Sequence, residues 1–449
     1  MTELPRKAAA RTARLAALPL GYAGRQAVGL GKRLGGKPAE AVLTEVQQRT
    51  AEQLFRTLGE LKGGAMKFGQ ALSVLEAALP EEVSAPYREH LTALQDSAPP
   101  MPTSTVREQL AKQLGPDWDQ HLVWLDGAPT AAASIGQVHR GRWRVEDSGE
   151  ELDVAVKVQY PGAGEALMSD LRQIARVAKG VAPVFPGIDI KPLVAELQDR
   201  AAEELDYHLE ADAQAAYAEA FADHPDIVVP GVVAVGTEVL VSEWLDSAHS
   251  LAHVIREGTQ EERDHYGELF VRFLFEGPRR TGMLHADPHP GNFRVIPGAD
   301  GSPGRLGVLD FGAVARLPDG QLPPAMGRLI RIAIDSDEES LVAGLRAEGF
   351  IKDRITVDPA MLLNYLSPFV EPAAQERFGF TRDWMREQFE RINDPRAESF
   401  TLATKLNLPT SYLLIHRTWL GSLGLLSQLG ASVPFREILE ESLPGFARA

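Results

Sequence analysis

The chain has 449 residues, of which 44% are hydrophobic and 24% are charged, and its formal net charge is −16. This length suggests two or three domains, and the composition is typical of a globular protein with a large core. The acidic balance excludes a general nucleic-acid binder, which needs a basic surface. The sequence contains no cysteine, which excludes disulfides, thiolate metal sites and cysteine nucleophiles.

Charge is unevenly distributed along the chain. Residues 1–37 contain eight lysines and arginines and one acid, which predicts a basic N-terminal arm over residues 1–38. Such an arm is typical either of a disordered tail or of a segment that docks on an anionic membrane surface. No stretch has the roughly 18 apolar residues of a membrane span, and Tyr412–Ala431 is predicted to be a buried helix. We therefore expect a cytoplasmic protein that can lie at the inner face of the membrane.

Residues 39–117 form the first structured region. Apolar residues such as Val42, Val46, Leu54 and Leu58 recur at helical spacings, so we predict a helical region. The proline cluster at Ala98–Pro102 predicts a linker within it.

Residues 118–246 change to short β-rich segments, followed by mostly helical sequence over residues 247–449. The first of these regions is predicted to contain five strands: His121–Leu125, Gln137–Val145, Leu152–Val158, Val232–Val235 and Val239–Trp244. A helical pattern over Val194–Phe221 follows the third strand, which indicates a compact α+β layout. The helical region is interrupted by a predicted hairpin of Asn292–Ile296 and Leu306–Leu309.

The segment His285–Asn292 is the richest in residues that can carry chemistry. Asp287 and Asn292 stand five residues apart in a loop rich in proline and glycine, and a strand follows directly. Phosphoryl transfer needs a carboxylate near the acceptor and oxygen ligands for Mg²⁺, which such a pair would supply. A tight turn held by Asx hydrogen bonds is the alternative interpretation. A zinc site at His285 and His289 is disfavoured, because the prolines forbid the helix that would align the two rings.

The tripeptide Asp310-Phe311-Gly312 is informative because it directly follows the predicted hairpin. The tripeptide is common on its own, but here it follows Asn292 by 18 residues. Asp310 could then join Asn292 as an oxygen ligand of Mg²⁺, a cation that keeps few protein ligands.

Lys157 interrupts the apolar strand Val154–Val158. An exposed edge strand would explain it, but a lysine held against nucleotide phosphates by a carboxylate partner is the sharper hypothesis. The acidic segment Glu203–Glu210 offers several such partners. Ahead of the strand, Ala131–Val138 lies where a loop that covers a nucleotide would be expected, although alanines replace most of the usual glycines and only Gly136 remains.

These parts follow the order of the protein-kinase signature motifs: loop, lysine strand, acidic helix, H-x-D-x-x-x-x-N and D-F-G. Leu61–Gln70 contains a K-x-G-Q motif that resembles the one in the ABC1/UbiB/ADCK family of atypical kinases. The alanine-rich loop and the E-x-D triplet of Glu204–Asp206 are similar to those of the same family. The resemblance covers about residues 60–315.

The resemblance implies a bilobal protein-kinase-like fold of the α+β class, with a small β-rich N-lobe (residues 118–246), a helical C-lobe (residues 247–449) and an N-terminal helical extension. It implies ATP or ADP and Mg²⁺ as cofactors. Asp287, Lys157 and Asn292 would be catalytic, with Asn292 and Asp310 as the metal ligands. The nucleotide would meet Lys157 with its partner Glu210, Asp310, the hinge residues Glu243 and Trp244, and the loop residues Ala131, Ala132, Ala133, Ser134, Gly136 and Val138.

The family resemblance also implies a regulatory role for Lys67 and Gln70. These residues would cover the site where a protein kinase accepts its peptide, with Lys67 paired to Glu204 and Asp206. The family supports isoprenoid quinone biosynthesis and lipid homeostasis, so the implied partners are a nucleotide, a quinone or lipid intermediate and an anionic membrane surface, and no nucleic acid.

Two features depart from typical protein kinases. No Ala-Pro-Glu follows Asp310, and Ala286 replaces the arginine that normally precedes the catalytic aspartate. A phosphorylated activation loop is therefore not expected. Two alternatives remain open: a small-molecule phosphotransferase of the aminoglycoside or choline kinase type, and a nucleotide-binding scaffold without catalysis. We favour an active atypical kinase or ATPase, because every polar residue expected for catalysis is present.

Overall fold

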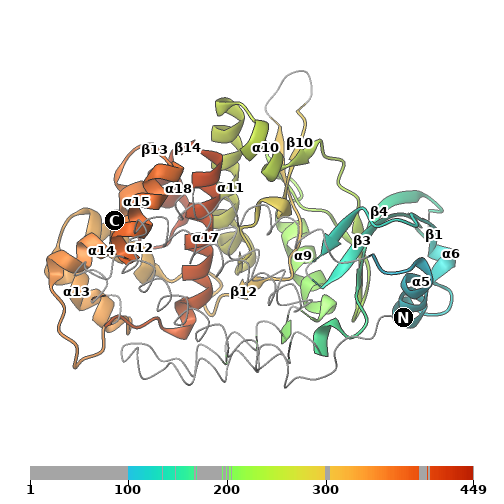
Figure 1. Ribbon diagram of the computed structural model, residues 1–449, viewed down its shortest axis with the longest axis horizontal. Helices are drawn as coiled ribbons and strands as arrows, with labels where there is room; N and C mark the ends of the chain where they lie inside the picture. Colours follow the sequence, from blue (N-terminus) through green and yellow to red (C-terminus); the bar gives the residue numbers. More distant parts are fainter. Residues whose placement is uncertain are drawn as a thin grey trace, which may run out of the picture.

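The computed structural model describes residues 100–165, 205–298, 304–393 and 405–447, apart from Ser134 and Asp147, with a few isolated positions between these ranges. The predicted basic arm, the K-x-G-Q motif and residues 39–99 of the predicted N-terminal helical extension lie outside the described residues. Figure 1 shows a small β-rich part on the right and a larger, mostly helical part on the left.

The small part is built on a six-stranded antiparallel sheet. The strand order is β1-β3-β4-β7-β6, and β2 pairs with β3. Its strands are β1 (Leu122–Leu125), β2 (Ala131–Ala133), β3 (Gly136–Arg144), β4 (Glu151–Gln159), β6 (Val232–Gly236) and β7 (Val239–Glu243). Among the described residues, the sheet is accompanied by helices α5 (Thr103–Leu114), α6 (Trp118–His121) and α9 (Tyr207–Ala220).

Residues of strand β4 alternate between two packed faces of this sheet. Val154, Val156 and Val158 are fully buried in a cluster with Val106 and Leu110 of α5. The intervening residues face α9, because neighbouring side chains of a strand point to opposite sides. β4 is therefore a central strand covered on both faces, and the interpretation of Lys157 as a residue on an exposed edge is wrong.

The C-lobe begins with a second sheet of four short strands in the order β5-β11-β10-β8. They are β5 (Ile227–Val228), β8 (His249–Ser250), β10 (Phe293–Ile296) and β11 (Arg305–Val308), and only the β5–β11 pair is parallel. A separate pair joins β9 (Met283–His285) to β12 (Val314–Arg316), and the 3-10 turn η2 (Pro290–Asn292) leads into β10. Helices α10 (Leu251–Glu257) and α11 (Gln260–Thr281) precede β9.

Helix α11 is capped at both ends. Thr259 and Glu262 form a reciprocal capping box at its start. Gly282 ends the helix at φ 72°, a left-handed conformation that glycine adopts at little cost. The chain is thereby turned directly into β9, which carries the first residues of the predicted catalytic loop.

The elements that follow β12 are helices, one 3-10 turn and a short strand pair, and we call this group the C-terminal helices. They comprise α12 (Pro324–Ile334), α13 (Glu338–Ala347), α14 (Pro359–Ala374), β13 (Phe378–Gly379), α15 (Arg382–Asn393), η4 (Thr410–Tyr412), α17 (Leu413–Leu429), β14 (Ser432–Val433) and α18 (Phe435–Ser442). Helix α17 confirms the buried helix predicted at Tyr412–Ala431. In the part of the chain that the structure describes, no helix is both long and apolar enough to cross a bilayer.

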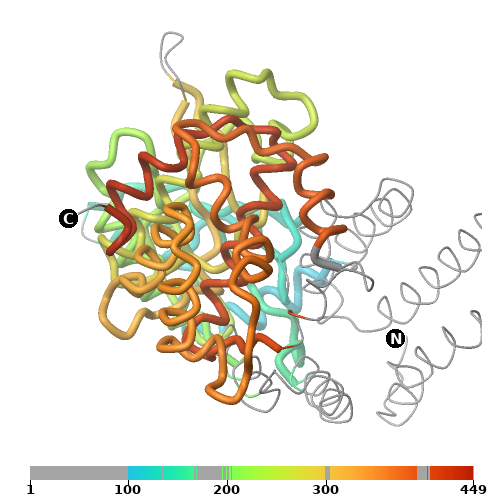
Figure 2. Tube along the Cα trace, turned by 90° about the vertical axis from the view of Figure 1, so that its left-hand side faces the viewer, coloured from blue at the N-terminus to red at the C-terminus, as the bar shows by residue number. Residues whose placement is uncertain are grey.

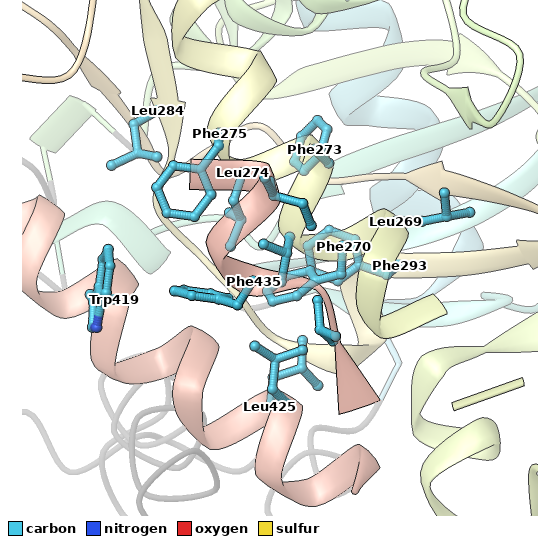
Figure 3. Packing of buried hydrophobic residues seen from close by; sticks show 14 of the residues in the cluster. Leu269, Phe270, Phe273, Leu274, Phe275, Leu284, Phe293, Trp419, Leu425 and Phe435 are labelled. Atoms are coloured by element: carbon cyan, nitrogen blue, oxygen red, sulfur yellow. The ribbon is translucent and has the colours of Figure 1, made fainter. Parts of the chain in front are cut away.

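One aromatic core joins α11 to the C-terminal helices (Figure 3). Phe275 of α11 meets Trp419 of α17 and Phe435 of α18 edge to face, with ring centroids 6.0 and 6.1 Å apart. Trp419 and Phe435 complete the triangle at 5.8 Å. Such edge-to-face contacts are favourable beyond the area that they bury, so the C-terminal helices are an integral part of the C-lobe core.

The predicted kinase-like α+β fold is confirmed, and all seven predicted strands are found with each bound shifted by no more than one residue. Two local differences stand out. Ala131–Ala133, predicted as a loop, is a strand that pairs with β3. The helix predicted over Val194–Phe221 is interrupted before Tyr207, because the Asp206 side chain accepts a hydrogen bond from the His208 amide and caps a new helix. Helix α5, assigned to the extension from sequence, shares the core of the N-lobe sheet.

Candidate functional site

Lys157 lies at the centre of the candidate site. Its Nζ donates to Glu210 Oε1 of α9 at 2.7 Å and to Asp310 Oδ1 at 3.2 Å. Only 15% of the Lys157 side chain and 3% of the Glu210 side chain are exposed. Val138 stands directly opposite Lys157 in the β3–β4 register, so both lie on the face of the sheet that carries the site.

Electrostatics keep Lys157 charged. Burial by itself lowers the pKa of a lysine, but the carboxylates of Asp310 and Glu210 outweigh burial and raise the pKa of Lys157 well above its ordinary value. The Tyr207 ring lies under the ammonium at 5.2 Å from its centroid, and burial raises the pKa of that phenol so that it stays neutral. The site therefore holds a permanent cation that is shared between two carboxylates.

Asp310 adopts a left-handed backbone conformation with φ 59°. Its Oδ1 accepts from the Gly312 amide at 3.2 Å as well as from Lys157, and its carbonyl accepts from His285 Nε2 at 2.9 Å. Positive φ is uncommon outside glycine, although aspartate tolerates it better than most residues. These bonds hold the carboxylate toward Lys157 and turn the next residue, Phe311, into the core.

Aromatic side chains that pack around Phe311 fix the turn at Asp310. Phe311 is 1% exposed and packs between Tyr217 of α9 and His285 of β9, with ring centroids 5.0 and 5.3 Å away. The Tyr217 hydroxyl donates to the Met283 carbonyl of β9 at 2.6 Å. Helix α9, which carries Glu210, is thereby fixed to the strand that leads into the catalytic loop.

Asp287 and Asn292 meet across the predicted catalytic loop. Asn292 Nδ2 donates to Asp287 Oδ2 at 2.9 Å and to the Asp287 carbonyl at 3.2 Å. His289 caps the turn between them by accepting from the Gly291 amide. The alternative interpretation as a hydrogen-bonded turn thus describes the local backbone correctly, and this turn is what places the two side chains together.

Strand pairing brings Asn292 next to Asp310. Phe293 of β10 pairs with Val308 of β11, and the Leu309 amide donates to the Asn292 carbonyl at 2.8 Å. Because the amide nitrogen of Asn292 is bound to Asp287, its amide oxygen is the group left for a cation. One carboxylate and one amide oxygen suit Mg²⁺, which completes its shell with water and phosphate oxygens. No cluster of three or more His, Asp or Glu ligands occurs among the described residues, so the donor set remains this small.

The alanine-rich hairpin is held closely against the sheet. A Cβ at Gly136 would lie 2.2 Å from the Val158 carbonyl oxygen, so only glycine fits there. Ile135 is buried in a small cluster with Tyr207 and Leu240. Ala131 and Ala132 are exposed, as residues that cover a ligand would be, and Ser134 lies outside the described residues.

The predicted hinge residues use their amides within the protein. The Glu243 amide donates to the Gly231 carbonyl at 2.9 Å, and the Trp244 amide donates to the Asp153 carbonyl at 2.8 Å. The Glu243 carboxylate in turn accepts from the Gly231 amide. A contact between this segment and adenine would therefore involve other backbone groups, and it stays a prediction.

Of the predicted regulatory residues, only Asp206 is described. Its side chain caps α9, four residues before Glu210. Lys67, Gln70 and Glu204 lie outside the described residues, so the pairing of Lys67 with Asp206 stays a prediction.

Sequence reasoning missed Arg417. This residue of α17 places its guanidinium NH2 4.0 Å from Asp287 Oδ1, and about half of its side chain is exposed. The signal was present in the sequence, because an arginine interrupts an otherwise apolar helix that we interpreted only as buried. Its role depends on a contact between residues 130 positions apart, which no local pattern reveals.

We predict that Glu210→Gln destabilises the protein by roughly 3 kcal/mol, the lower end of the range for a broken buried ion pair, because Asp310 still holds Lys157. Urea unfolding measures this loss. Glu219→Gln on the exposed face of the same helix is the matched control, and an equal effect of the two substitutions would contradict the role given to the pair.

We further predict that stability falls as pH drops from about 7 to 5. Burial lowers the pKa of His285 despite the nearby Asp287 and Asp310. Below the unfolded value of about 6.5, the unfolded chain therefore binds a proton that the folded chain does not. His285→Gln keeps an N–H donor but cannot titrate. The free energy of unfolding of this variant should therefore fall less steeply than that of the wild type as the pH is lowered. The two slopes should differ by up to about 1.4 kcal/mol per pH unit. Identical slopes for the two proteins would rule this out.

Comparison with known proteins agrees with this geometry. Residues 93–343 match the ABC1 atypical kinase-like domain. The atypical kinase coq-8, mitochondrial, of Caenorhabditis elegans is 30% identical over 332 residues, which are 73% of this chain and 42% of that protein. The atypical kinase COQ8B, mitochondrial, of Rattus norvegicus is 31% identical over 302 residues, which are 66% of this chain and 53% of that protein. The chain thus spans about half the length of these curated relatives.

A solved structure is similar over nearly the whole chain. It is the complex of Rv3197 with erythromycin from Mycobacterium tuberculosis, with 41% sequence identity and a TM-score of 0.67, and the match covers 92% of this chain and all of that one. The ordered motifs, the geometry around Lys157 and these matches lead to one conclusion. The chain belongs to the ABC1 atypical kinase-like family.

Proposed function

We propose that this protein binds a Mg²⁺-nucleotide, ATP or ADP, at the site around Lys157 and acts as an atypical kinase or ATPase. The observation that carries the proposal is the double contact of the Lys157 ammonium with Glu210 and Asp310. A buried lysine in this arrangement can contact phosphate oxygens with its remaining hydrogen, and Asp310 stands beside it as a metal ligand.

The catalytic loop supplies the other groups that the reaction requires. Asp287 can accept the proton of an attacking hydroxyl or water, and its bond with Asn292 fixes the direction of its carboxylate. Asn292 and Asp310 would hold the magnesium ion, which neutralises charge on the phosphates when it is bound. Arg417 adds a second cation next to Asp287 and would offset the negative charge that gathers there.

We also propose a role in isoprenoid quinone biosynthesis or lipid homeostasis. Support comes from membership of the family and from the relatives named as COQ8-type atypical kinases. In the same proposal, Lys67 and Gln70 cover the site against protein substrates, and the basic residues 1–38 bind an anionic membrane surface. The names of these relatives state a mitochondrial location, and the cytoplasmic location expected for this chain stays a prediction.

Thermal unfolding with ATP or ADP, with and without Mg²⁺, tests nucleotide binding. A ligand at 100 times its dissociation constant adds about 2.7 kcal/mol of stability, so we expect a clear rise in the unfolding temperature. Asp310→Asn should abolish the part that depends on Mg²⁺, since asparagine tolerates the positive φ but lacks the charge.

The exposed Asp319→Asn is the matched control and should respond like the wild type. Stabilisation by Mg²⁺-nucleotide that persists in Asp310→Asn would reject the assigned metal ligand. No stabilisation of the wild type at millimolar nucleotide would reject the site. Because the similar solved structure contains erythromycin, we would add that compound to the same series as a second ligand class.

Arg417→Gln should lower kcat/KM for Mg-ATP turnover about tenfold, equivalent to ~1.4 kcal/mol of transition-state stabilisation, because a cation beside Asp287 is lost. Arg436→Gln removes an arginine that pairs with Glu440 on α18, away from Asp287, and should leave turnover unchanged. Equal turnover of both variants would show that Arg417 has no part in the reaction.

A further inference from the structure

The guanidinium of Arg417 reaches the catalytic loop from within the C-lobe. Figure 1 shows its helix, α17, in the mostly helical part of the molecule, apart from the N-lobe sheet that carries Lys157. Figure 2, which looks onto the C-lobe end, shows the orange and red C-terminal helices in front of the cyan N-lobe strands. The two cations of the site thus come from different lobes, and among the described residues only Arg417 forms an ion pair with Asp287.

Arg417 has no hydrogen-bond partner among the described residues. Its NH2 lies 4.0 Å from Asp287 Oδ1, which is too long for a hydrogen bond, and 49% of its side chain is exposed. An arginine carries five N–H donors and stays charged at any ordinary pH. The guanidinium is therefore a permanent cation whose donors are accessible to a ligand.

The sequence of α17 gives Arg417 no partner within its own helix. Residues three and four positions away are neighbours on a helix surface, and here they are Leu413, Leu414, Leu420 and Gly421. Other arginines on the described helices do have a carboxylate one turn away: Arg272 pairs with Glu268, Arg280 with Glu276, Arg386 with Asp383 and Arg436 with Glu440. Arg417 thus differs from arginines that stabilise a helix, and its donors are left for another group.

The two carboxylate oxygens of Asp287 have different surroundings. Oδ2 accepts from Asn292 Nδ2 at 2.9 Å, whereas Oδ1 is the oxygen next to Arg417. In the described part of the chain no hydrogen bond reaches Oδ1, so this oxygen is better placed to accept the proton of an attacking hydroxyl. A hydroxyl bound to Oδ1 lies beside the guanidinium, so an anionic group that binds Arg417 must be close to that hydroxyl in the same molecule.

We propose that Arg417 binds a carboxylate or phosphate group of the molecule that accepts the phosphoryl group. The acceptor is then a small anion whose hydroxyl is near its charged group, such as an α-hydroxy or β-hydroxy acid. A guanidinium suits both kinds of anion, because it can donate two parallel hydrogen bonds to them. This inference rests on the function proposed above and adds the chemical class of the acceptor.

The transfer step assigns one role to each group. The acceptor hydroxyl oxygen attacks the γ-phosphorus of ATP, and its proton passes to Asp287 Oδ1. A new O–P bond to the acceptor forms, the bond between the γ-phosphorus and the β–γ bridging oxygen breaks, and ADP leaves with that electron pair. Arg417 holds the anionic group of the acceptor throughout, so it positions the hydroxyl next to Asp287.

Phosphoryl transfer from Mg-ATP to probes with one carbon skeleton tests the proposal, with the phosphorylated product measured by mass spectrometry. Glycerate and glycerol phosphate carry an anion, whereas glyceramide and glycerol do not. We expect kcat/KM for an anionic probe to exceed that for glycerol at least about tenfold, because charge-assisted hydrogen bonds are the stronger kind. Preference for glycerate identifies a carboxylate acceptor, and preference for glycerol phosphate identifies a phosphate ester.

Arg417→Gln should bring the ratio of kcat/KM for anionic and uncharged probes close to unity, besides its effect on turnover as a whole. Arg417→Lys keeps the charge but not the paired donors, so it should retain only part of the preference. Arg436→Gln on α18 is the control and should keep the ratio of the wild type. An unchanged ratio in Arg417→Gln, or a wild type without preference for anionic probes, would overturn the proposal.

Saturation-transfer NMR with glycerate in the absence of nucleotide separates this inference from the proposed function. Circular dichroism confirms that each variant is folded. Glycerate binding that is lost in Arg417→Gln, in a protein that Mg-ATP does not stabilise, would reject the nucleotide site and support the anion site. Stabilisation by Mg-ATP without binding or phosphorylation of any probe would support the nucleotide site and overturn the inference.

Discussion

The ammonium of Lys157 between two carboxylates is the interaction on which the site depends. The three residues come from three parts of the fold: Lys157 from the central strand of the N-lobe sheet, Glu210 from α9 and Asp310 from the turn after β11. Separation of the buried cation from its carboxylates is expensive, because the ammonium would be left without solvent or a partner. The three elements are therefore held at fixed distances from one another, and the site is preorganised before any ligand arrives.

The aromatic side chains around Phe311 connect the site to the C-lobe core. Phe311 meets the Tyr217 ring at a tilt and the His285 ring edge to face, and Phe273 of α11 contacts both Tyr217 and His285. Helix α11 also packs on α17 and α18 through Phe275, so the C-terminal helices reach the site through one continuous core. Helix α17 has two roles in this arrangement, since Arg417 approaches the catalytic loop while Trp419 packs in the aromatic core.

The predictions that succeeded from sequence rest on local patterns with a chemical reason. A lysine in an apolar strand needs a carboxylate, which pointed to the acidic segment that contains Glu210. An aspartate and an asparagine five residues apart in a proline-rich loop can meet only across a turn, and Asp287 and Asn292 do so. The failures concern features that depend on distant contacts. The strand character of Ala131–Ala133 comes from its pairing with β3, and the contact of Arg417 with Asp287 spans 130 residues.

The hydrogen bond from Tyr217 to the Met283 carbonyl has a consequence for ligand traffic. This bond fixes α9 to strand β9 of the C-lobe, and the Lys157–Glu210 pair fixes the same helix to strand β4 of the N-lobe. A helix anchored at both levels cannot swing aside to admit or release a ligand without breaking buried bonds. The β2–β3 hairpin is different, since its turn is held by Gly136 and Ile135 whereas Ala131 and Ala132 of β2 are exposed to solvent. Helix α9 thus acts as a rigid frame between the two lobes, and a change of shape at the site would fall to elements other than this helix.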